Sequence, residues 1–288
     1  MLPSWAITAA GTLALDDLTT PAGHERDLPG GSALYFSLAA SRFCRVRAVA
    51  AIGEDGTRLR QTLLEAGVDC DSVAQLPGAS YHWRAQHDPD ASAPLREEQR
   101  LGVYLDWRPQ LSPAARSSEI LFLGSMHPGR QLQVLEQCPG ARLVALDTMR
   151  DFIASDAPAL DRLLERVGVL LANEAELRAL LGDQVSPPAG LAHGAIARWG
   201  LQAVVLKRGR QGALLVSRDT ATEYPPAGDG VVVDPTGAGD ALAGGLLGRL
   251  AQLGRSDPEA LEIAMVEGGA AARAAISTFG AAGLRSWR

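Results

Sequence analysis

Lysine is nearly absent from this chain of 288 residues. Lys207 is the only one among 27 basic side chains, and the rest are arginines, so a mechanism that needs an ammonium group depends on one position. Cysteine is scarce as well: Cys44, Cys70 and Cys138 lie far apart, with no Cys-x-x-Cys pair and no histidine at metal-ligand spacing. This distribution argues against a disulfide framework or a zinc site and predicts reduced cysteines in a cytoplasmic protein.

Long apolar runs and an excess of positive charge are missing too. The apolar stretch Ala6–Leu15 is broken by Asp16 and Asp17, well short of the roughly 18 residues of a membrane span. No arginine precedes Arg26, so a secretory signal is not expected. A net charge of −6 argues against a protein that coats nucleic acid or a membrane surface. With 47% hydrophobic and 21% charged residues, the composition is ordinary for a globular protein and excludes wholesale disorder.

What is present is an alternation of apolar runs and helical stretches. An apolar, strand-like segment covers Trp5–Leu15, and Gly30-Gly31 opens an alanine-rich helix over Ser32–Phe43. The next predicted strand and helix are Val46–Ile52 and Thr57–Ala66. Further strands are predicted at Ile120–Leu123, Arg142–Leu146, Val167–Leu171 and Ala203–Leu206. Strands that alternate with helices predict an α/β fold with a mostly parallel sheet covered on both faces.

One region breaks this alternation. Residues Ala79–Asp106 contain aromatic side chains in alternating stretches, separated by a polar turn from Asp88 to Pro94. The pattern predicts a β-hairpin. Two interpretations remain open: an ordinary edge hairpin, or a flap over a site at the carboxyl ends of the sheet strands.

The segment from Val231 to Asp240 predicts an anion-binding site with a carboxylate beside it. Three valines predict a strand, Gly237-Ala238-Gly239 a turn, and Ala241–Leu253 a long apolar helix. Free backbone N–H groups at a helix start bind anions. A carboxylate at Asp240 beside such a site suits a general base that deprotonates an attacking hydroxyl; the alternative is a capping aspartate. A dinucleotide fingerprint and a P-loop are both excluded, because Leu242 replaces the last glycine and Arg208 follows the lysine.

The string Asp-Pro-Thr-Gly-Ala-Gly-Asp at positions 234–240 closely resembles the C-terminal signature of the ribokinase-like (PfkB) carbohydrate kinase family. Other elements resemble that family's motifs and occur in the same order. They are Gly11–Asp16, Gly30-Gly31, Gly53–Gly56, Asn173–Glu176 and Lys207–Gly212.

This resemblance implies a fold and a reaction. It implies that residues 1–288 form a single domain with a doubly wound, mostly parallel sheet, helices on both faces, and a small β lid from about 17–29 and 79–106. It also implies transfer of the γ-phosphoryl group of ATP to a hydroxyl or hydroxymethyl group of a small sugar or sugar-like substrate. A nucleoside kinase and a non-catalytic sugar or nucleotide sensor are the alternatives, and the presence of Asp240 counts against the sensor.

The resemblance also implies roles for individual residues. Asp240 would be the base, with the amides of Gly237, Ala238 and Gly239 as the anion hole. Glu176 and Asn173 would hold Mg²⁺ through water. The nucleotide would contact Asn173, Lys207, Gly209 and Gly212, and the acceptor would contact Asp16, Gly30, Gly31 and Tyr35. Asp234 and Thr236 would hold a monovalent cation such as K⁺.

The departures from the family pattern concern the acceptor. Tyr35 stands where many sugar-specific members have an asparagine, and a tyrosine cannot make the same pair of amide contacts. The hairpin carries Tyr81, His82, Trp83 and Arg84, which could stack on a base or a sugar face or form a dimer contact. Because an isolated hairpin is marginally stable, we expect a homodimer through the lid. The strand end at Asp147-Thr148-Met149 is expected to line the cleft.

Overall fold

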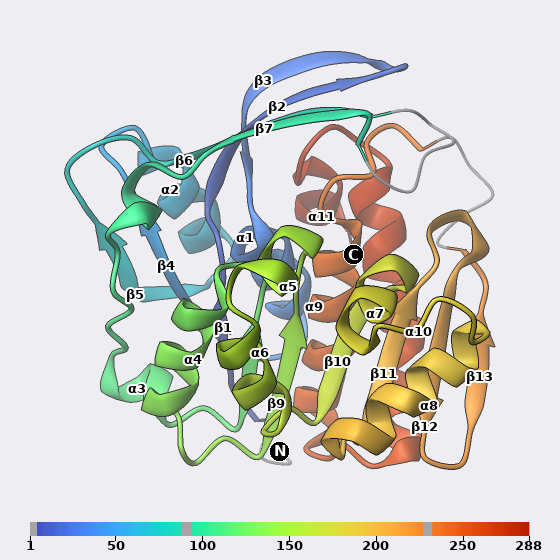
Figure 1. Cartoon of the computed structure of the whole chain (residues 1–288). Helices are drawn as coiled ribbons and strands as arrows, with labels where there is room; N and C mark the ends of the chain where they lie inside the picture. Colours follow the sequence, from blue (N-terminus) through green and yellow to red (C-terminus); the bar gives the residue numbers. More distant parts are fainter. Residues whose placement is uncertain (1–4, 88–93, 227–231, 288) are drawn as a thin grey trace.

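The structure is a computed structural model that describes residues 5–87, 94–226 and 232–287 (Figure 1). Its main feature is a nine-stranded sheet in the order β13-β12-β11-β10-β9-β8-β1-β4-β5. The strands from β11 to β5 in that order run parallel. Strand β12 pairs antiparallel with β11, and β13 pairs antiparallel with β12. The bounds are β1 (Ile7–Ala10), β4 (Val46–Ile52), β5 (Asp69–Gln75), β8 (Ile120–Leu123), β9 (Leu143–Asp147), β10 (Val169–Asn173), β11 (Ala203–Lys207), β12 (Ala213–Ser217) and β13 (Ala221–Tyr224).

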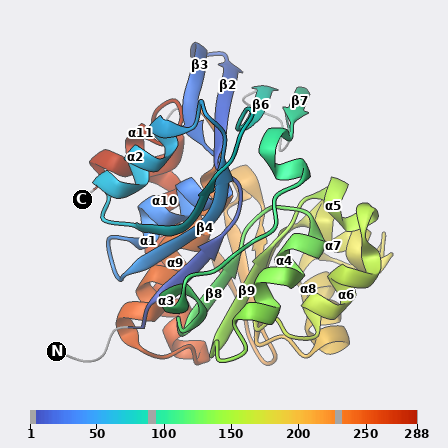
Figure 2. The same ribbon diagram turned by 90° about the vertical axis from the view of Figure 1, so that its left-hand side faces the viewer.

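Helices cover both faces of this sheet, as the turned view shows (Figure 2). One layer is α1 (Ser32–Ala40), α2 (Thr57–Glu65), α9 (Ala238–Leu253), α10 (Pro258–Ile276) and α11 (Ala282–Ser286). The other is α3 (Pro113–Arg116), α4 (Pro128–Gln137), α5 (Arg150–Ser155), α6 (Ala157–Leu164), α7 (Glu174–Leu181) and α8 (Pro188–Trp199). Strand β8 shows why there are two cores: Ile120 and Phe122 point into one, and Leu121 and Leu123 into the other, as the alternation of side chains along a strand requires. The predicted α/β fold, with a mostly parallel sheet and helices on both faces, is confirmed.

A second sheet of four strands, in the order β3-β2-β6-β7, lies over the carboxyl ends of the central strands (Figure 1). Its strands are β2 (Ala14–Thr20), β3 (Gly23–Gly30), β6 (Tyr81–Gln86) and β7 (Arg96–Arg100), followed by the short helix η1 (Gly102–Leu105). The antiparallel pair β6–β7 is the predicted hairpin, and it joins the small sheet because β6 pairs in parallel with β2. Residues 88–93 of its predicted turn lie outside the described residues.

Two predicted strands differ from the structure. The segment Trp5–Leu15 is two strands, because the chain leaves the large sheet after Ala10 and enters the small sheet at Ala14. The valines before the signature do not form a strand where they are described: the N–H of Val233 donates to the carbonyl of Ile276 at the end of α10, at 2.9 Å. Val231 lies outside the described residues. Strands β5, β12 and β13 were not predicted.

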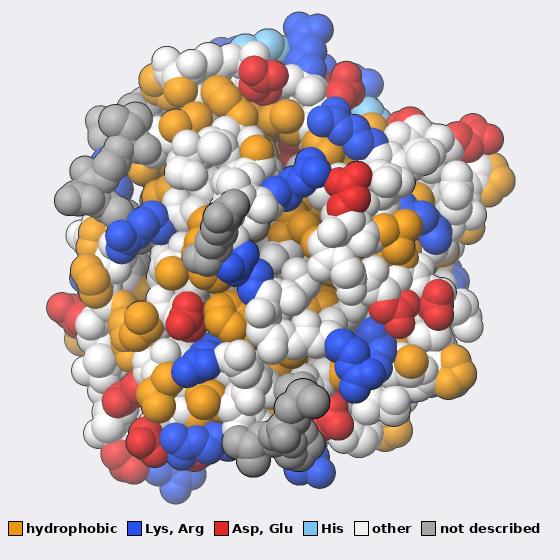
Figure 3. Space-filling view, turned by 180° about the vertical axis from the view of Figure 1, so that it is seen from behind, with side chains coloured by type: hydrophobic (Ala, Val, Ile, Leu, Met, Phe, Trp, Pro, Cys, Tyr) orange, Lys and Arg blue, Asp and Glu red, His pale blue; other side chains and the backbone are white. Residues whose placement is uncertain are grey.

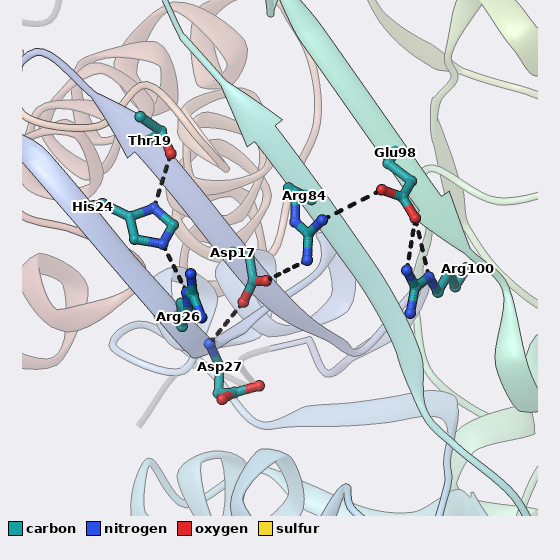
Figure 4. Close-up of polar contacts among 8 residues, drawn as sticks. All are labelled: Asp17, Thr19, His24, Arg26, Asp27, Arg84, Glu98 and Arg100. Carbon is teal, nitrogen blue, oxygen red and sulfur yellow. Dashed lines mark hydrogen bonds and ion pairs between the residues drawn. The ribbon is translucent and has the colours of Figure 1, made fainter.

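The outer face of the small sheet is polar (Figure 4). The Arg84 guanidinium donates to Asp17 at 3.2 Å and to Glu98 at 3.5 Å, and Glu98 also accepts from Arg100 at 2.9 Å. Exposed pairs of this kind contribute at most about 1 kcal/mol each. The residues that alternate with them, among them Asp16 and Trp83, belong to the inner face.

Seen from behind, basic and acidic side chains are interspersed over the face (Figure 3). None of the helices in the described ranges combines the length and the hydrophobicity needed to cross a bilayer.

Candidate active site

A cavity of about 700 Å³ lies between the small sheet and the carboxyl ends of the central strands. Strand β1 pairs with β4 on one side and with β8 on the other. The chain therefore adds β4 and β5 on one side of β1 and the later strands on the other side, and the order of strands reverses next to β1. Thr12 follows β1, Ser125 follows β8, and both line the cavity. Open α/β sheets bind ligands at such a topological switch point.

The cavity brings together most of the residues that the sequence singled out. Those in its lining are Asp16, Gly31, Tyr35, Glu176, Lys207, Thr236, Gly237, Ala238, Gly239 and Asp240. The strand end Asp147-Thr148-Met149 also lines it. Gly30, Asn173, Gly209, Gly212 and Asp234 are not among the lining residues.

The start of α9 supplies free backbone donors. Gly237 precedes the helix with φ 71°, a left-handed conformation that favours glycine. A Cβ there would stand 2.3 Å from the ring of Tyr35, so close packing also requires glycine. The N–H of Ala238 donates to Pro235 at 3.3 Å, whereas those of Gly237 and Gly239 make no hydrogen bond within the described residues. These two amides are available to an anion at the positive end of the helix dipole.

Asp240 stands in the first turn of the same helix. Burial and repulsion from Asp147 raise the pKa of its carboxyl to about 7, although Lys207 opposes the shift. A pKa near the working pH suits a general base, because the group is then both ionised and basic enough to accept a proton.

Lys207 forms a partly buried ion pair with Asp147. Its Nζ lies 2.7 and 2.8 Å from the two carboxylate oxygens, and the side chains are 20% and 5% exposed. Burial alone would lower the pKa of Lys207, but the carboxylates of Asp147, Glu176 and Asp240 outweigh it and raise the pKa above its usual value. The chain's one lysine therefore remains a cation among three acidic groups.

Asn173 and Glu176 form a reciprocal cap at the start of α7. The Oδ1 of Asn173 accepts the Glu176 N–H at 2.9 Å, and Oε2 of Glu176 accepts the Asn173 N–H at 2.7 Å. Burial raises the pKa of Glu176 despite the nearby Lys207. Its second oxygen, Oε1, has no hydrogen-bond partner among the described residues.

This arrangement fits Mg²⁺ held through water. No cluster of three or more His, Cys, Asp or Glu side chains that could hold a metal occurs within the described ranges. Mg²⁺ commonly keeps several waters and uses one or two carboxylates together with substrate phosphates. Glu176 faces the cavity with one free oxygen, which is the donor that such an ion needs.

The remaining predicted residues support the site from behind or lie apart from it. Both oxygens of the buried Asp234 accept backbone N–H groups, from Thr236 and Gly280, each at 2.9 Å. Gly30 packs directly on Asp16, since a Cβ there would lie 1.8 Å from Oδ2. Gly209 and Gly212 shape the turn between β11 and β12, so their nucleotide role stays a prediction.

Several lining residues were missed from the sequence. Ser125 is one of them, and its buried hydroxyl has no hydrogen-bond partner among the described residues; the same holds for the hydroxyl of Thr148, at the strand end that was expected to line the cleft. Arg130 and Phe152 also face the cavity, from α4 and α5. The three missed residues, Ser125, Arg130 and Phe152, follow the carboxyl ends of β8 and β9, and that position is the signal that could have identified them.

Three hydrogen bonds join the small sheet and η1 to the rest of the domain around the cavity. His87, just after β6, hydrogen-bonds through Nε2 to the Thr236 hydroxyl at 3.2 Å. On the other side, the Gln99 amide donates to Asp151 of α5 at 3.4 Å. Arg130 of α4 donates to the carbonyl of Leu105 at 2.9 Å. The small sheet and its following segment therefore contact the loop before α9, helix α5 and, through η1, helix α4.

The chain is similar in sequence and in structure to known kinases. Residues 105–287 match the model of the pfkB family carbohydrate kinases. A cytidine kinase of Thermococcus kodakarensis is 28% identical over 248 residues, which cover 84% of this chain and 87% of the relative. Among solved structures, a Burkholderia thailandensis nucleoside kinase in complex with inosine has a TM-score of 0.75 at 20% identity, covering 98% of this chain and 93% of that one. A Vibrio cholerae fructokinase with bound fructose, ADP and calcium has a TM-score of 0.77 at 23% identity, covering 98% and 96%.

Proposed function

Because this chain belongs to the pfkB family of carbohydrate kinases, and is thus a phosphotransferase, we propose that it transfers the γ-phosphoryl group of ATP to a hydroxyl of a nucleoside, with Asp240 as the general base. The observation that carries the reaction is the placement of Asp240. Its carboxyl, with a pKa of about 7, lies within one helical turn of the free N–H groups, in the cavity that residues of the small sheet also line. A base beside an anion site serves a hydroxyl that attacks phosphorus.

The chain's own groups account for the steps. Asp240 accepts the proton of the acceptor hydroxyl. At the same time the oxygen of that hydroxyl bonds to the γ-phosphorus of ATP, and the bond from this phosphorus to the ADP oxygen breaks. The Gly237 and Gly239 amides stabilise the negative charge on the transferred group. Mg²⁺, when bound, supplies further charge neutralisation, and Glu176 would hold it through water. Phosphoryl transfer depends mainly on such positioning and electrostatics.

A nucleoside ranks above a free sugar as the acceptor. Besides Asp240, the cavity is lined by the aromatic residues Tyr81 and Trp83 of the small sheet and by Phe152 of α5. A flat base can stack on such side chains. The cytidine kinase relative, matched over most of both chains, supports the same choice.

An ATP-consumption screen over ribonucleosides, pentoses and hexoses tests this proposal. We expect turnover with at least one ribonucleoside at a kcat/KM at least tenfold above that of any free sugar. Turnover of a hexose or pentose alone would restore the sugar-kinase interpretation. Absence of ATP consumption with every acceptor, together with binding of a ligand, would favour the sensor.

Two further predictions stay open to test. A homodimer through the small sheet would bring together outer faces that carry charges of both signs (Figure 4), and light scattering over a concentration series measures it. A monovalent cation at Asp234 and Thr236 predicts activation by K⁺ over an inert cation at constant ionic strength.

A further inference from the structure

The carboxylate that pairs with the chain's one lysine is firmly held. Asp147 ends β9, Lys207 ends β11, and β10 lies between these strands in the sheet. Both oxygens of Asp147 accept from the Lys207 ammonium, at 2.7 and 2.8 Å, and Oδ1 also accepts the Thr148 N–H at 2.8 Å. The Asp147 side chain is only 5% exposed. These hydrogen bonds and the burial fix the position of the carboxylate.

The ammonium lies beside the anion-binding amides. A Cβ on Gly239 would stand 3.2 Å from Cδ of Lys207 and 3.3 Å from its Nζ, so the end of the lysine side chain packs on this glycine. Gly239 carries one of the two free N–H groups of the loop, and both residues line the cavity. An ammonium has three N–H groups, and the two oxygens of Asp147 engage at most two of them. At least one N–H is therefore left for a ligand that the amides bind.

Asp240 is the competing partner of this ammonium. Burial is the main cause of the raised pKa of Asp240; Asp147 raises it further, whereas Lys207 lowers it. Within the described ranges, Asp147 is the only carboxylate that lies within 4.0 Å of the lysine Nζ. An ammonium bonded to Asp240 would stabilise the charged form of that carboxylate and occupy the oxygen that must accept the proton. By pairing with the lysine, Asp147 leaves the general base free.

We propose that Asp147 is a positioning residue for phosphoryl transfer, which holds the Lys207 ammonium beside the Gly239 amide. There the remaining N–H of the ammonium contacts the transferred phosphoryl group. The same pairing keeps the ammonium away from Asp240. This inference rests on the proposed phosphoryl transfer, and it keeps apart the two charges that the reaction needs. A cation held in place in this way stabilises the transition state without reorganisation.

The lysine itself is a direct probe, because the chain has no other. Protein isotopically labelled in lysine alone should give one side-chain ammonium signal in nuclear magnetic resonance spectra. We expect this signal of the wild type to shift when a non-hydrolysable ATP analogue is added with Mg²⁺, and to shift less with ADP, which lacks the transferred group. A signal that does not move at saturating analogue, with binding established by calorimetry, would overturn the contact.

A double-mutant cycle tests whether Asp147 acts through the lysine. Lys207→Met should lower kcat by about 10²-fold, as for the loss of one donor to the developing charge. Asp147→Asn should lower kcat by at least about tenfold, because the ammonium is no longer held in place, and should leave the KM of the acceptor unchanged. The double variant should lose no more than Lys207→Met alone. Losses that multiply, or near-wild-type turnover of Asp147→Asn, would overturn the positioning role.

Asp69→Asn is the matched control. Asp69 begins β5 in the same sheet, its carboxylate lies 3.9 Å from Arg47, and its Oδ1 accepts the Asp71 N–H at 2.9 Å. It does not line the cavity, so the same substitution there should leave kcat unchanged. Because a partner left unpaired destabilises the fold, the double variant, which lacks both charges, and the wild-type signal keep the test independent of the folding of Asp147→Asn.

Two other outcomes are distinguishable. If Asp147 held Mg²⁺ instead, Asp147→Asn would raise the Mg²⁺ concentration needed for half-activation, and that result would overturn the proposal. If the wild type consumes no ATP with any acceptor, the proposed function itself fails, whereas the lysine signal still measures the contact with the nucleotide.

Discussion

The substitution Asp240→Asn should have opposite effects on catalysis and stability. Burial and repulsion from Asp147 raise the pKa of Asp240 to about 7, whereas an ordinary aspartate titrates near ~3.9. At neutral pH the folded chain therefore holds a carboxylate where its charge is disfavoured. Asparagine has nearly the same shape and no charge, so it relieves this cost and removes the proton acceptor.

The magnitude follows from the pKa. A raised carboxyl pKa means that the folded chain binds the proton more tightly than the unfolded chain, so wild-type stability decreases from about pH 4 to about pH 7. At about 1.4 kcal/mol per unit, the cost approaches about 4 kcal/mol at pH 8 and is about 1.5 kcal/mol at pH 5. The stability advantage of Asp240→Asn should therefore grow by roughly 3 kcal/mol between pH 5 and pH 8.

Urea unfolding at pH 5, 6, 7 and 8 measures this difference, and phosphoryl transfer at pH 8 should show a kcat lower by about 10²–10⁴-fold. A suitable control is Asp257→Asn at the start of α10. There the backbone N–H of Ala260 and the nearby Arg255 lower the pKa of the exposed carboxyl although residual desolvation opposes them, so this variant should gain no stability as the pH rises. Near-wild-type turnover of Asp240→Asn would refute the role of Asp240 as the general base. A stability difference that does not change with pH would refute the claim that the folded chain disfavours the charged form of Asp240.

Three further substitutions test the surroundings of the site. Glu176→Gln should raise the Mg²⁺ concentration needed for half-activation at saturating ATP, because the carboxylate orders the water shell of the ion; an unchanged titration curve would reduce Glu176 to a helix cap. Lys207→Met should move the acid limb of the kcat/KM profile to higher pH, because the ammonium lowers the pKa of Asp240; an unshifted limb would contradict that coupling. Trp83→Ala should raise the KM of the acceptor and not of ATP, since the side chain lines the cavity; if both values stay the same and only light scattering changes, Trp83 serves the dimer.

The strands and the signature could be read from local sequence. Buried parallel strands such as Val46–Ile52 are nearly continuous apolar runs, because helices cover both of their faces, and the structure places β4 at those residues. The glycines at 237 and 239 and the aspartate at 240 predicted a helix start with free amides, because that geometry depends only on neighbours in the chain. The valines before them predicted a strand wrongly, because the hydrogen-bond partner of Val233 is Ile276, which no local pattern reveals.

The pairings that define the site were decided by tertiary structure. Lys207 meets Asp147 across 60 residues of sequence, and their meeting follows from the neighbouring positions of β9, β10 and β11 in the sheet. The ring of Tyr35 meets Gly237 because α1 and α9 pack on the same face. The pKa of Asp240 likewise depends on burial and on charges from other strands. Sequence determines which groups are available, whereas long-range packing determines which of them lose water and which charges they face, and those two quantities set the chemistry.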